Sequence, residues 1–326
     1  MELESITAIK HRIQAWQAAL CASICGYLAL GAATHTLKAY HWLLLALIPG
    51  AWLYGERLRR FFLDWAPMIA FWIVYDRLRL VQPLLLSRVS VEPVYEIERW
   101  AFGWIGGGAI PAHAGRAWLA AHAGLPAGSF LGWAAQIIYF SHLFFVPVLM
   151  LSWWASGKHG PRFAAHVKAF AVLHGLAILL YLLLPVAPPW WVSLHGTEHP
   201  TAELLAQSRI ADAMDGALVQ RMIKTASLYF AAVPSLHGAY PVLLFLLALK
   251  DRGRWKPAAL ALYGVAMWTA TVVLNQHYVV DLLAGGLLSL AAYWVMGRSR
   301  RASTSDITGC GTQNTTRDFQ STSSHP

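Results

Sequence analysis

The stretches PSLHGAYPVLLFLLAL (residues 234–249) and HYVVDLLAGGLLSLAAYWVM (residues 277–296) decide how this chain folds. Each is an apolar segment that carries ionisable side chains at its beginning, His237 in the first and His277 and Asp281 in the second. An ionisable group at membrane depth is costly and by default indicates function. The two stretches therefore predict membrane helices with a functional site at their N-terminal ends.

The composition places the chain among membrane proteins. Of its 326 residues 57% are hydrophobic and only 13% are charged, whereas about a quarter of a soluble domain is charged. Several apolar runs approach the ~20 residues that cross a bilayer. We predict an all-α, polytopic transmembrane bundle of six to eight spans, because the second of the eight is short enough to be re-entrant or tilted. The eight expected spans are Ile13–Thr34, His41–Tyr54, Trp65–Leu86, Leu131–Ala155, Lys168–Pro185, Tyr229–Leu249, Pro257–Asn275 and Val279–Met296.

Basic residues gather on one side of this eight-span arrangement. They are Lys10, Arg12, Arg57, Arg59, Arg60, Lys158, Arg162, Lys168, Lys250, Arg252, Arg254, Lys256, Arg298, Arg300 and Arg301. The positive-inside rule makes this side cytoplasmic, so His237 and His277 both reach the extracytoplasmic face. Topology and attraction to anionic membrane lipids explain the net charge of +9. No nucleic-acid partner is expected, since that would need a basic stripe on a soluble face.

We expect three parts along the chain. Residues 1–62 form N-terminal membrane spans, and residues 63–298 form a transmembrane domain that carries the candidate functional residues. Within the second part, the amphipathic stretch Val94–Trp100 is expected to lie in the membrane interface. Residues 299–326 are polar and predict a disordered cytoplasmic tail. The protein is thus expected to be an integral, multi-pass membrane protein.

The spacing of His277 and Asp281 favours acid–base or nucleophilic chemistry. Residues four apart share one face of a helix. An aspartate that accepts from one imidazole nitrogen selects the tautomer and frees the other nitrogen to act on a substrate. Two alternatives remain at this point. In the first, Asp281 only stabilises a helix N-terminus. In the second, two histidines and a carboxylate hold iron or zinc, although no His-x-x-His or Glu-x-x-His pair accompanies them.

The residues around His237 predict a helix start that favours an anion. Pro234 and Ser235 precede it, and a serine here can cap free backbone N–H groups. Pro241 lacks the N–H that would bond the His237 carbonyl, which loosens the backbone. Free N–H groups at a helix N-terminus attract phosphate. The alternative is an interfacial histidine at a helix cap.

These motifs resemble the type 2 phosphatidic acid phosphatase superfamily. The likeness rests on Phe230–His237 followed by Asn275–Gly286, and extends more loosely to Tyr75–Arg79, Ser141-His142 and Leu184–Trp190. It is closest to the branch of the inositol phosphorylceramide synthases, which has Pro-Ser-Leu-His where lipid phosphatases have Ser-Gly-His.

The resemblance implies that residues 63–298 are a catalytic transmembrane domain with a phosphatase-like helical core. It also implies phosphotransfer that moves a phosphoryl-linked headgroup to or from a lipid, without a metal or another cofactor. By carry-over, His277 attacks phosphorus and forms a phosphohistidine, Asp281 orients and stabilises its imidazolium, and His237 protonates the leaving oxygen. The implied partners are a lipid phosphate and a small alcohol acceptor or water. The alternatives are a lipid-phosphate or polyprenyl-diphosphate phosphatase and, from a different class, a transporter or noncatalytic lipid-binding scaffold.

The chain departs from the phosphatases in its basic residues. No lysine has an arginine seven residues later, and Thr271 stands where phosphatases carry an arginine before the last histidine. Other donors must then neutralise the phosphate. The candidates are Arg77, Arg79, Ser235, Arg221 and Lys224. For the first two the alternative is a structural role, with Arg79 paired to Asp76 at a helix end.

The predicted orientation can be tested by labelling single cysteines in a background without Cys21, Cys25 and Cys310. We expect a cysteine at Thr197 to react with an impermeant reagent from outside, and cysteines at Gly253 and Ser303 to react from inside, because the basic loop that includes Gly253 resists translocation. Labelling of Thr197 and Gly253 from the same side would contradict the span order.

Overall fold

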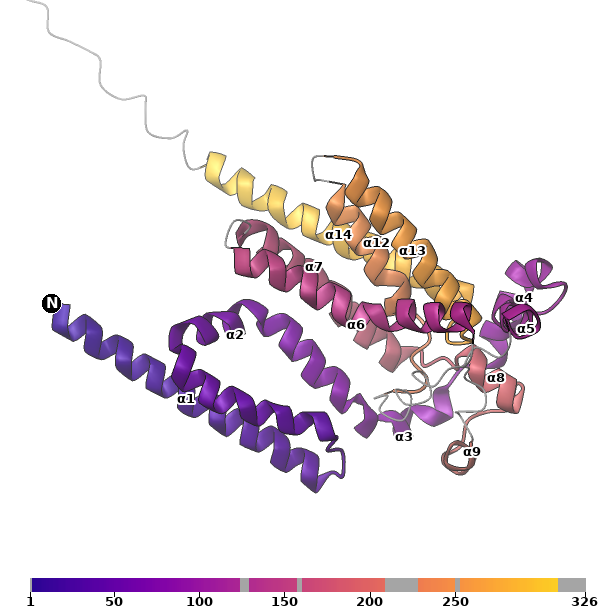
Figure 1. Ribbon diagram of the computed structural model, residues 1–326, viewed down its shortest axis with the longest axis horizontal. Helices are drawn as coiled ribbons and strands as arrows, with labels where there is room; N and C mark the ends of the chain where they lie inside the picture. The colour runs from indigo at the N-terminus through magenta and orange to yellow at the C-terminus, as the bar shows by residue number, and fades with distance from the viewer. Residues whose placement is uncertain (1, 124–128, 157–159, 209–227, 250–252, 310–326) are drawn as a thin grey trace, which may run out of the picture. The chain divides into compact units, whose positions relative to one another are not determined.

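The computed structural model describes residues 2–123, 129–156, 160–208, 228–249 and 253–309. Almost all of these residues lie in helices (Figure 1). The described part of the chain holds no strand, only isolated parallel bridges from Ser90 to Val186 and from Val186 to Ala231. The expected all-α class is therefore confirmed. The chain divides into two compact units, and the boundary falls between Leu84 and Leu85.

The first unit is a helical hairpin. Helix α1 (Glu2–Ala33) packs against α2 (Leu47–Arg77) and the 3₁₀ helix η1 (Ala39–Ala46). Helix α2 is bent at Gly55, whose φ of 38° lies in the left-handed region that glycine adopts without steric cost (Figure 1). The bend means that the short second span, expected over His41–Tyr54, is a 3₁₀ turn followed by a short helix.

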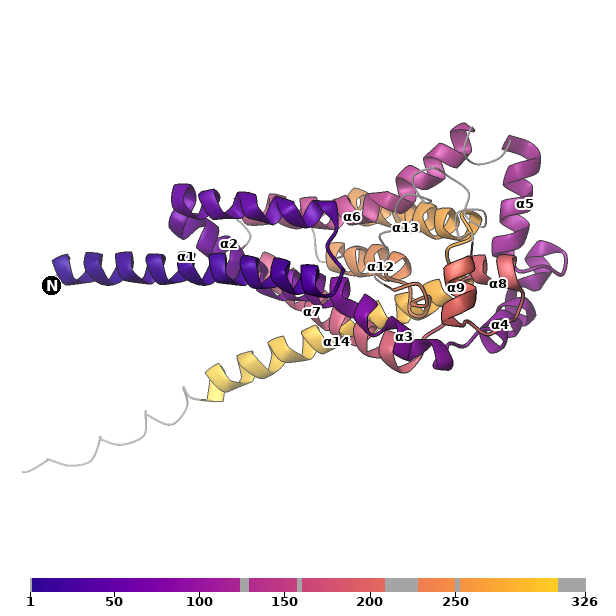
Figure 2. The ribbon, with the colours of Figure 1, turned by 90° about the horizontal axis from the view of Figure 1, so that it is seen from below.

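The short helices η2 and α3 follow α2. The second unit contains η3 and every later helix of the described chain. Their bounds are η2 Leu78–Leu80, α3 Gln82–Leu85, η3 Leu86–Arg88, α4 Glu92–Phe102, η4 Gly103–Gly106, α5 Pro111–Ala123, α6 Phe130–Ser156, α7 Gly160–Leu183, α8 Pro189–His195, α9 Ala202–Gln207, α12 Leu236–Ala248, α13 Trp255–Val273 and α14 Val279–Gly309. Helix α12 packs against α13 and α14, while α13 also contacts α5 and α6, and α14 contacts α4 and α7 (Figure 2).

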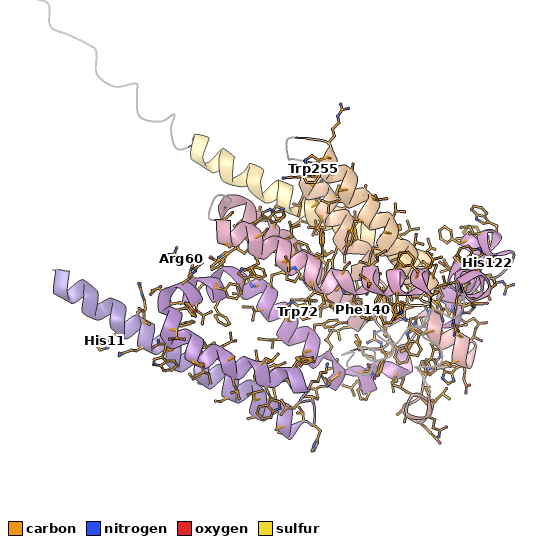
Figure 3. All side chains as sticks on the ribbon, viewed as in Figure 1. His11, Arg60, Trp72, His122, Phe140 and Trp255 are labelled. Atoms are coloured by element: carbon orange, nitrogen blue, oxygen red, sulfur yellow. The ribbon has the colours of Figure 1, made fainter. Side chains whose placement is uncertain are left out.

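Four of the described helices contain segments long and apolar enough to cross a membrane, and two more segments are apolar but shorter. The four are His11–Ala33, Phe130–Ser156, Phe163–Leu183 and Trp255–Val273, and the shorter two are Leu236–Ala248 and Val279–Val295. The outward faces of these helices are apolar too. Phe144 on α6, Leu262 on α13 and Leu287 on α14 are each about two-thirds exposed or more, at 68%, 71% and 66%. In Figure 3 the side chains that project from α6 and α13 consist mostly of carbon atoms, and Trp255 lies at the start of α13. Apolar exteriors of this kind suit contact with lipid.

Several segment ends differ from the sequence prediction, among them the third span, which was expected to reach Leu86 but whose helix α2 ends at Arg77. Helix α12 begins at Leu236 rather than at Tyr229, because Pro234 disfavours helical backbone in the residue before it and Ser235 caps the first turn. Helix α14 continues to Gly309, beyond Ser299 where the polar tail was expected to begin, and the disorder of that tail stays a prediction. Neither proline nor glycine interrupts residues 298–308, and the helical hydrogen bonds can therefore continue. Residues 310–326 lie outside the described part.

The close approach of α12 and α14 depends on two glycines. A Cβ on Gly238 would lie 2.7 Å from the Cα and carbonyl oxygen of Leu282, and a Cβ on Gly285 would collide with the Ser235 carbonyl. Without these methyl groups the Ser235 N–H donates to the Asp281 carbonyl at 3.0 Å. Small residues at a crossing let two helix backbones touch, which is common inside membrane bundles. The glycines thus allow the start of α12 to meet the start of α14.

We predict that Gly285→Ala lowers stability by about 1–3 kcal/mol, the usual range for overpacking a buried contact. Gly286→Ala is the matched control, because its added Cβ would have ordinary contacts of 3.7 Å to Trp268 and Val242. That control should be neutral or stabilise by up to about 1 kcal/mol, since alanine favours a helix over glycine. Thermal unfolding of both variants in detergent measures the difference, and an equal loss in the two would contradict the contact.

Candidate active site

The two sequence motifs meet where α12 and α14 begin. His237 lies in the first turn of α12, whose N-cap Ser235 accepts from the Gly238 N–H at 3.2 Å as predicted. His277 lies two residues before α14, and Asp281 lies in its first turn. Helices α12 and α14 thus bring together side chains that are 40 residues apart in the sequence.

The three side chains form a hydrogen-bonded chain. His277 Nδ1 lies 3.3 Å from Asp281 Oδ2, and His277 Nε2 lies 3.2 Å from His237 Nδ1. Asp281 is fully buried and His277 is 8% exposed. The predicted approach of the histidines to one another is confirmed, and the two atoms of the His277 ring that can do chemistry are both engaged.

With Asp281 ionised, the contacts fit one arrangement of protons. An ionised Asp281 only accepts, so His277 donates from Nδ1 and keeps a lone pair on Nε2. That lone pair then accepts from the Nδ1–H of His237. The resting site therefore holds a potential nucleophile, His277, and a potential proton donor, His237, joined by one hydrogen bond.

The reason for the His277–Asp281 contact differs from the one that the spacing predicts. The two residues do not share a helix face, because His277 precedes the helix. Instead, Asp281 is the third residue of α14, and its Oδ2 accepts from the Tyr278 N–H at 2.9 Å. An acidic side chain at this position commonly reaches back to the N-cap N–H. Asp281 therefore caps its own helix and orients His277 with the same oxygen.

Two residues of α6 confine the His237 ring. Tyr139 stacks on it with ring centroids 4.4 Å apart, and His142 meets it edge-on at 4.0 Å. The Tyr139 carbonyl accepts from His142 Nδ1. Ser141-His142 entered the sequence analysis only as part of a loose family likeness. No sequence signal places these rings against His237, since the contact needs α6 to pack beside α12.

A tight turn delivers His277 from the end of α13. Asn275 has a φ of 61°, a left-handed conformation that asparagine tolerates better than most residues. Its side-chain amide donates to Ser193 Oγ at 2.8 Å. The buried Thr271 accepts at its carbonyl from the N–H groups of Gln276 and His277, at 3.0 and 3.4 Å. Thr271, which replaces the phosphatases' arginine, thus helps to end α13 and begin this turn.

Glu98 on α4 is a residue that the sequence analysis did not single out. It is fully buried, and its two carboxylate oxygens accept from the N–H groups of Val279 and Val280 at 2.9 and 3.0 Å. A signal for it existed, because Glu98 shares a helix face with Val94 and Tyr95, which pack against the fully buried Tyr278. A carboxylate on an apolar face needs a partner.

Burial raises the pKa of the Glu98 carboxyl. The two backbone N–H donors oppose this shift, while the negative charge of Asp281 adds to it. A charged carboxylate without donors would be far more costly at such a depth. The backbone of α14 is therefore what allows Glu98 to be buried here.

The predicted phosphate-binding residues are distributed differently. Arg77 and Arg79 lie in the first unit, where Arg79 pairs with Asp76 at 3.0 Å and Arg77 donates to Thr36 Oγ1 at 2.6 Å. The Asp76–Arg79 ion pair of the alternative interpretation thus exists, and a phosphate-binding role for either arginine stays a prediction. Ser235 is fully buried as the α12 cap. Arg221 and Lys224 lie outside the described residues.

The described residues place no three His, Cys, Asp or Glu side chains so that they could hold a metal ion together. In the site itself the facing nitrogens of His237 and His277 are hydrogen-bonded to one another rather than turned toward a common point. This geometry gives the iron or zinc alternative no support among the described residues.

Comparison with known proteins identifies the family to which these motifs belong. The PAP2 superfamily matches residues 109–295, which is more than half of the chain and includes His237, His277 and Asp281. The chain belongs to the PAP2 superfamily. The family resemblance inferred from the two histidine motifs is thereby confirmed. No solved structure matches the chain significantly.

The proteins similar to this chain include a phosphoinositol dihydroceramide synthase and inositol phosphorylceramide synthases. The phosphoinositol dihydroceramide synthase of Bacteroides thetaiotaomicron is 25% identical over 79% of this chain and 84% of its own length. The inositol phosphorylceramide synthase of Candida albicans is 32% identical over 38% of this chain, and the catalytic subunit from Saccharomyces cerevisiae is 30% identical over 36%. These matches cover only 27% and 30% of the fungal proteins.

The family and these relatives bear out the expected class. The chain is an integral membrane protein of the PAP2 superfamily, and a lipid phosphotransferase fits the names of its relatives, which belong to the branch expected from Pro-Ser-Leu-His. The transporter and scaffold alternatives find no counterpart among these relatives.

Proposed function

We propose that this protein is a membrane phosphotransferase that moves a phosphoryl-linked headgroup from one lipid oxygen to another through a phosphohistidine. The observation that carries the proposal is the chain of contacts from Asp281 through His277 to His237 in a member of this superfamily. The names of the relatives support inositol phosphate as the headgroup and a ceramide-type lipid as one of the two partners.

In the first half-reaction His277 Nε2 attacks phosphorus and the bond from phosphorus to the leaving lipid oxygen breaks. Asp281 holds the Nδ1–H of His277 and stabilises the imidazolium that forms. His237 gives its Nδ1 proton to the leaving oxygen, so the lipid departs as a neutral alcohol. In the second half-reaction His237 takes the proton of the acceptor hydroxyl, which attacks phosphorus and releases His277.

The resting hydrogen bond between the histidines must open for this reaction. A reacting phosphorus needs about 3–3.5 Å from the attacking nitrogen, and the leaving oxygen needs a hydrogen-bond distance from His237. Both cannot fit between nitrogens that lie 3.2 Å apart. Substrate therefore takes the place of His277 as the acceptor of the His237 proton. The stacking on Tyr139 keeps the His237 ring beside the site while it moves.

The proposal extends to three properties of the reaction. It needs no metal, because a side chain supplies the nucleophile and basic groups would neutralise the phosphate. The site opens to the extracytoplasmic face, as supported by the distribution of basic residues. Arg77, Arg79, Arg221 and Lys224 are the proposed basic groups.

The test of function is incubation of purified protein with phosphatidylinositol carrying labelled inositol, with phosphatidic acid and with a polyprenyl diphosphate, each with and without dihydroceramide.

We predict that ³²P-labelled phosphatidylinositol traps an acid-labile phosphoenzyme in the wild type and in the presence of EDTA, but not in His277→Ala. His237→Ala and Asp281→Ala should slow turnover by about 10²–10⁴-fold, as for other proton-transfer and orienting groups. The matched control is His122→Ala, since His122 is exposed at the end of α5 (Figure 3). Near-normal turnover in His277→Ala would end the phosphohistidine proposal, and rescue of an EDTA-inactivated enzyme by one divalent ion would favour a metal mechanism.

We also predict that transfer exceeds hydrolysis when an acceptor lipid is present. A bound acceptor beside the phosphohistidine has a high effective concentration, which can outweigh the abundance of water. The measurement is the ratio of transferred product to released inositol phosphate, or to free phosphate from monoesters, as dihydroceramide is raised. Hydrolysis that dominates at every acceptor concentration, for each lipid that turns over, would favour the phosphatase instead.

A further inference from the structure

We propose that Glu98 is a positioning residue of this active site, which fixes the start of α14 and thereby places His277 and Asp281. The proposal deepens the proposed function, because its catalytic readout rests on the chemistry of those two residues. Glu98 itself touches neither histidine in the contacts described above. It acts through the backbone of Val279 and Val280.

The argument begins with the donors at the N-terminus of α14. A helix leaves its first N–H groups without partners inside the helix. In α14 the Tyr278 N–H is taken by Asp281, and the next two, of Val279 and Val280, are taken by the two oxygens of Glu98. Three consecutive donors thus end on two carboxylates, one from the helix itself and one from α4.

Both carboxylates gain from this position. Negative charge is stabilised by the dipole at a helix N-terminus, and hydrogen bonds to an ionised acceptor are roughly twice as strong as neutral ones. Glu98 lies 181 residues before Val279 in the sequence, so its two bonds fix the first turn of α14 against a different helix. Because Asp281 belongs to that turn and His277 directly precedes it, their directions depend on where the turn is held.

Apolar packing holds α4 in place independently of Glu98, so a positioning role of Glu98 can be distinguished from a general contribution to stability. Tyr278 is fully buried in a cluster with Ile110 and Ala112, and Val94 and Tyr95 of α4 pack against the same cluster. This apolar contact keeps α4 against the α13–α14 turn without any help from Glu98. Loss of the carboxylate should therefore leave the fold intact while it releases the backbone that carries the catalytic side chains.

The test compares Glu98→Gln with Glu96→Gln. Glutamine keeps the shape of Glu98 but retains only one acceptor oxygen, and its NH₂ group would face one of the two backbone N–H groups. Glu96 lies on the same helix, is exposed, and pairs with Arg99 at 3.3 Å, so the same substitution there changes charge without touching α14. Glu98→Ala, which removes both acceptors, gives the larger perturbation.

Two measurements decide the matter in purified full-length protein. Transfer from phosphatidylinositol to dihydroceramide should show a kcat lowered by about 10- to 100-fold in Glu98→Gln with KM almost unchanged, because misplacement of reacting groups acts on the chemical step. Hydrogen exchange resolved to single amides should become faster at Val279 and Val280, and also at Tyr278, whose N–H reports the position of the Asp281 carboxylate.

A kcat equal to that of Glu96→Gln, or unchanged exchange at Tyr278, would overturn the positioning role. The exchange measurement does not depend on the chemistry. A wild-type protein that turns over none of the lipids would count against the proposed function, and exchange at Tyr278 would still decide whether Glu98 positions Asp281.

Discussion

The direct backbone contact between the starts of α12 and α14 is the constraint on which the active site depends. The Ser235 N–H donates to the carbonyl of Asp281 itself, so a residue of the proposed catalytic chain also joins the two helices. Only hydrogen atoms fit at Gly238 and Gly285. Side chains at these positions would push the helices apart, and the 3.2 Å contact between His237 and His277 would be lost with them.

The way in which buried polar groups are satisfied explains much of the rest. Inside an apolar bundle, each backbone donor and each carboxylate needs a partner. At the start of α14 these needs are met reciprocally, because Asp281 and Glu98 supply acceptors to three backbone N–H groups that would otherwise have none. This has a chemical consequence. The N-terminus of α14 already holds two carboxylates and cannot also serve an incoming phosphate, whose charge must be balanced by cationic side chains.

The sequence was informative wherever the chemistry was local. Ser235 caps α12 as its position before Leu236 predicts, and Pro185 lies just beyond the end of α7. The His277–Asp281 pair was also predicted, although for the wrong reason. A spacing of four suggested one helix face, whereas the structure forms the contact by a helix cap that reaches back across the first turn. Both geometries bring residues four apart together, so spacing alone does not distinguish them.

The sequence by itself determined the membrane class, the family and which side chains are proposed to react, because these depend on composition and on short motifs. Only the tertiary structure decided how the reacting groups are held. Glu98, Tyr139 and His142 lie roughly 100 to 180 residues from the groups that they contact, and nothing local to α4 or α6 indicates which helix end or ring they will meet. That choice follows from the packing of α4, α6, α12 and α14, and hence from where small residues allow these helices to approach.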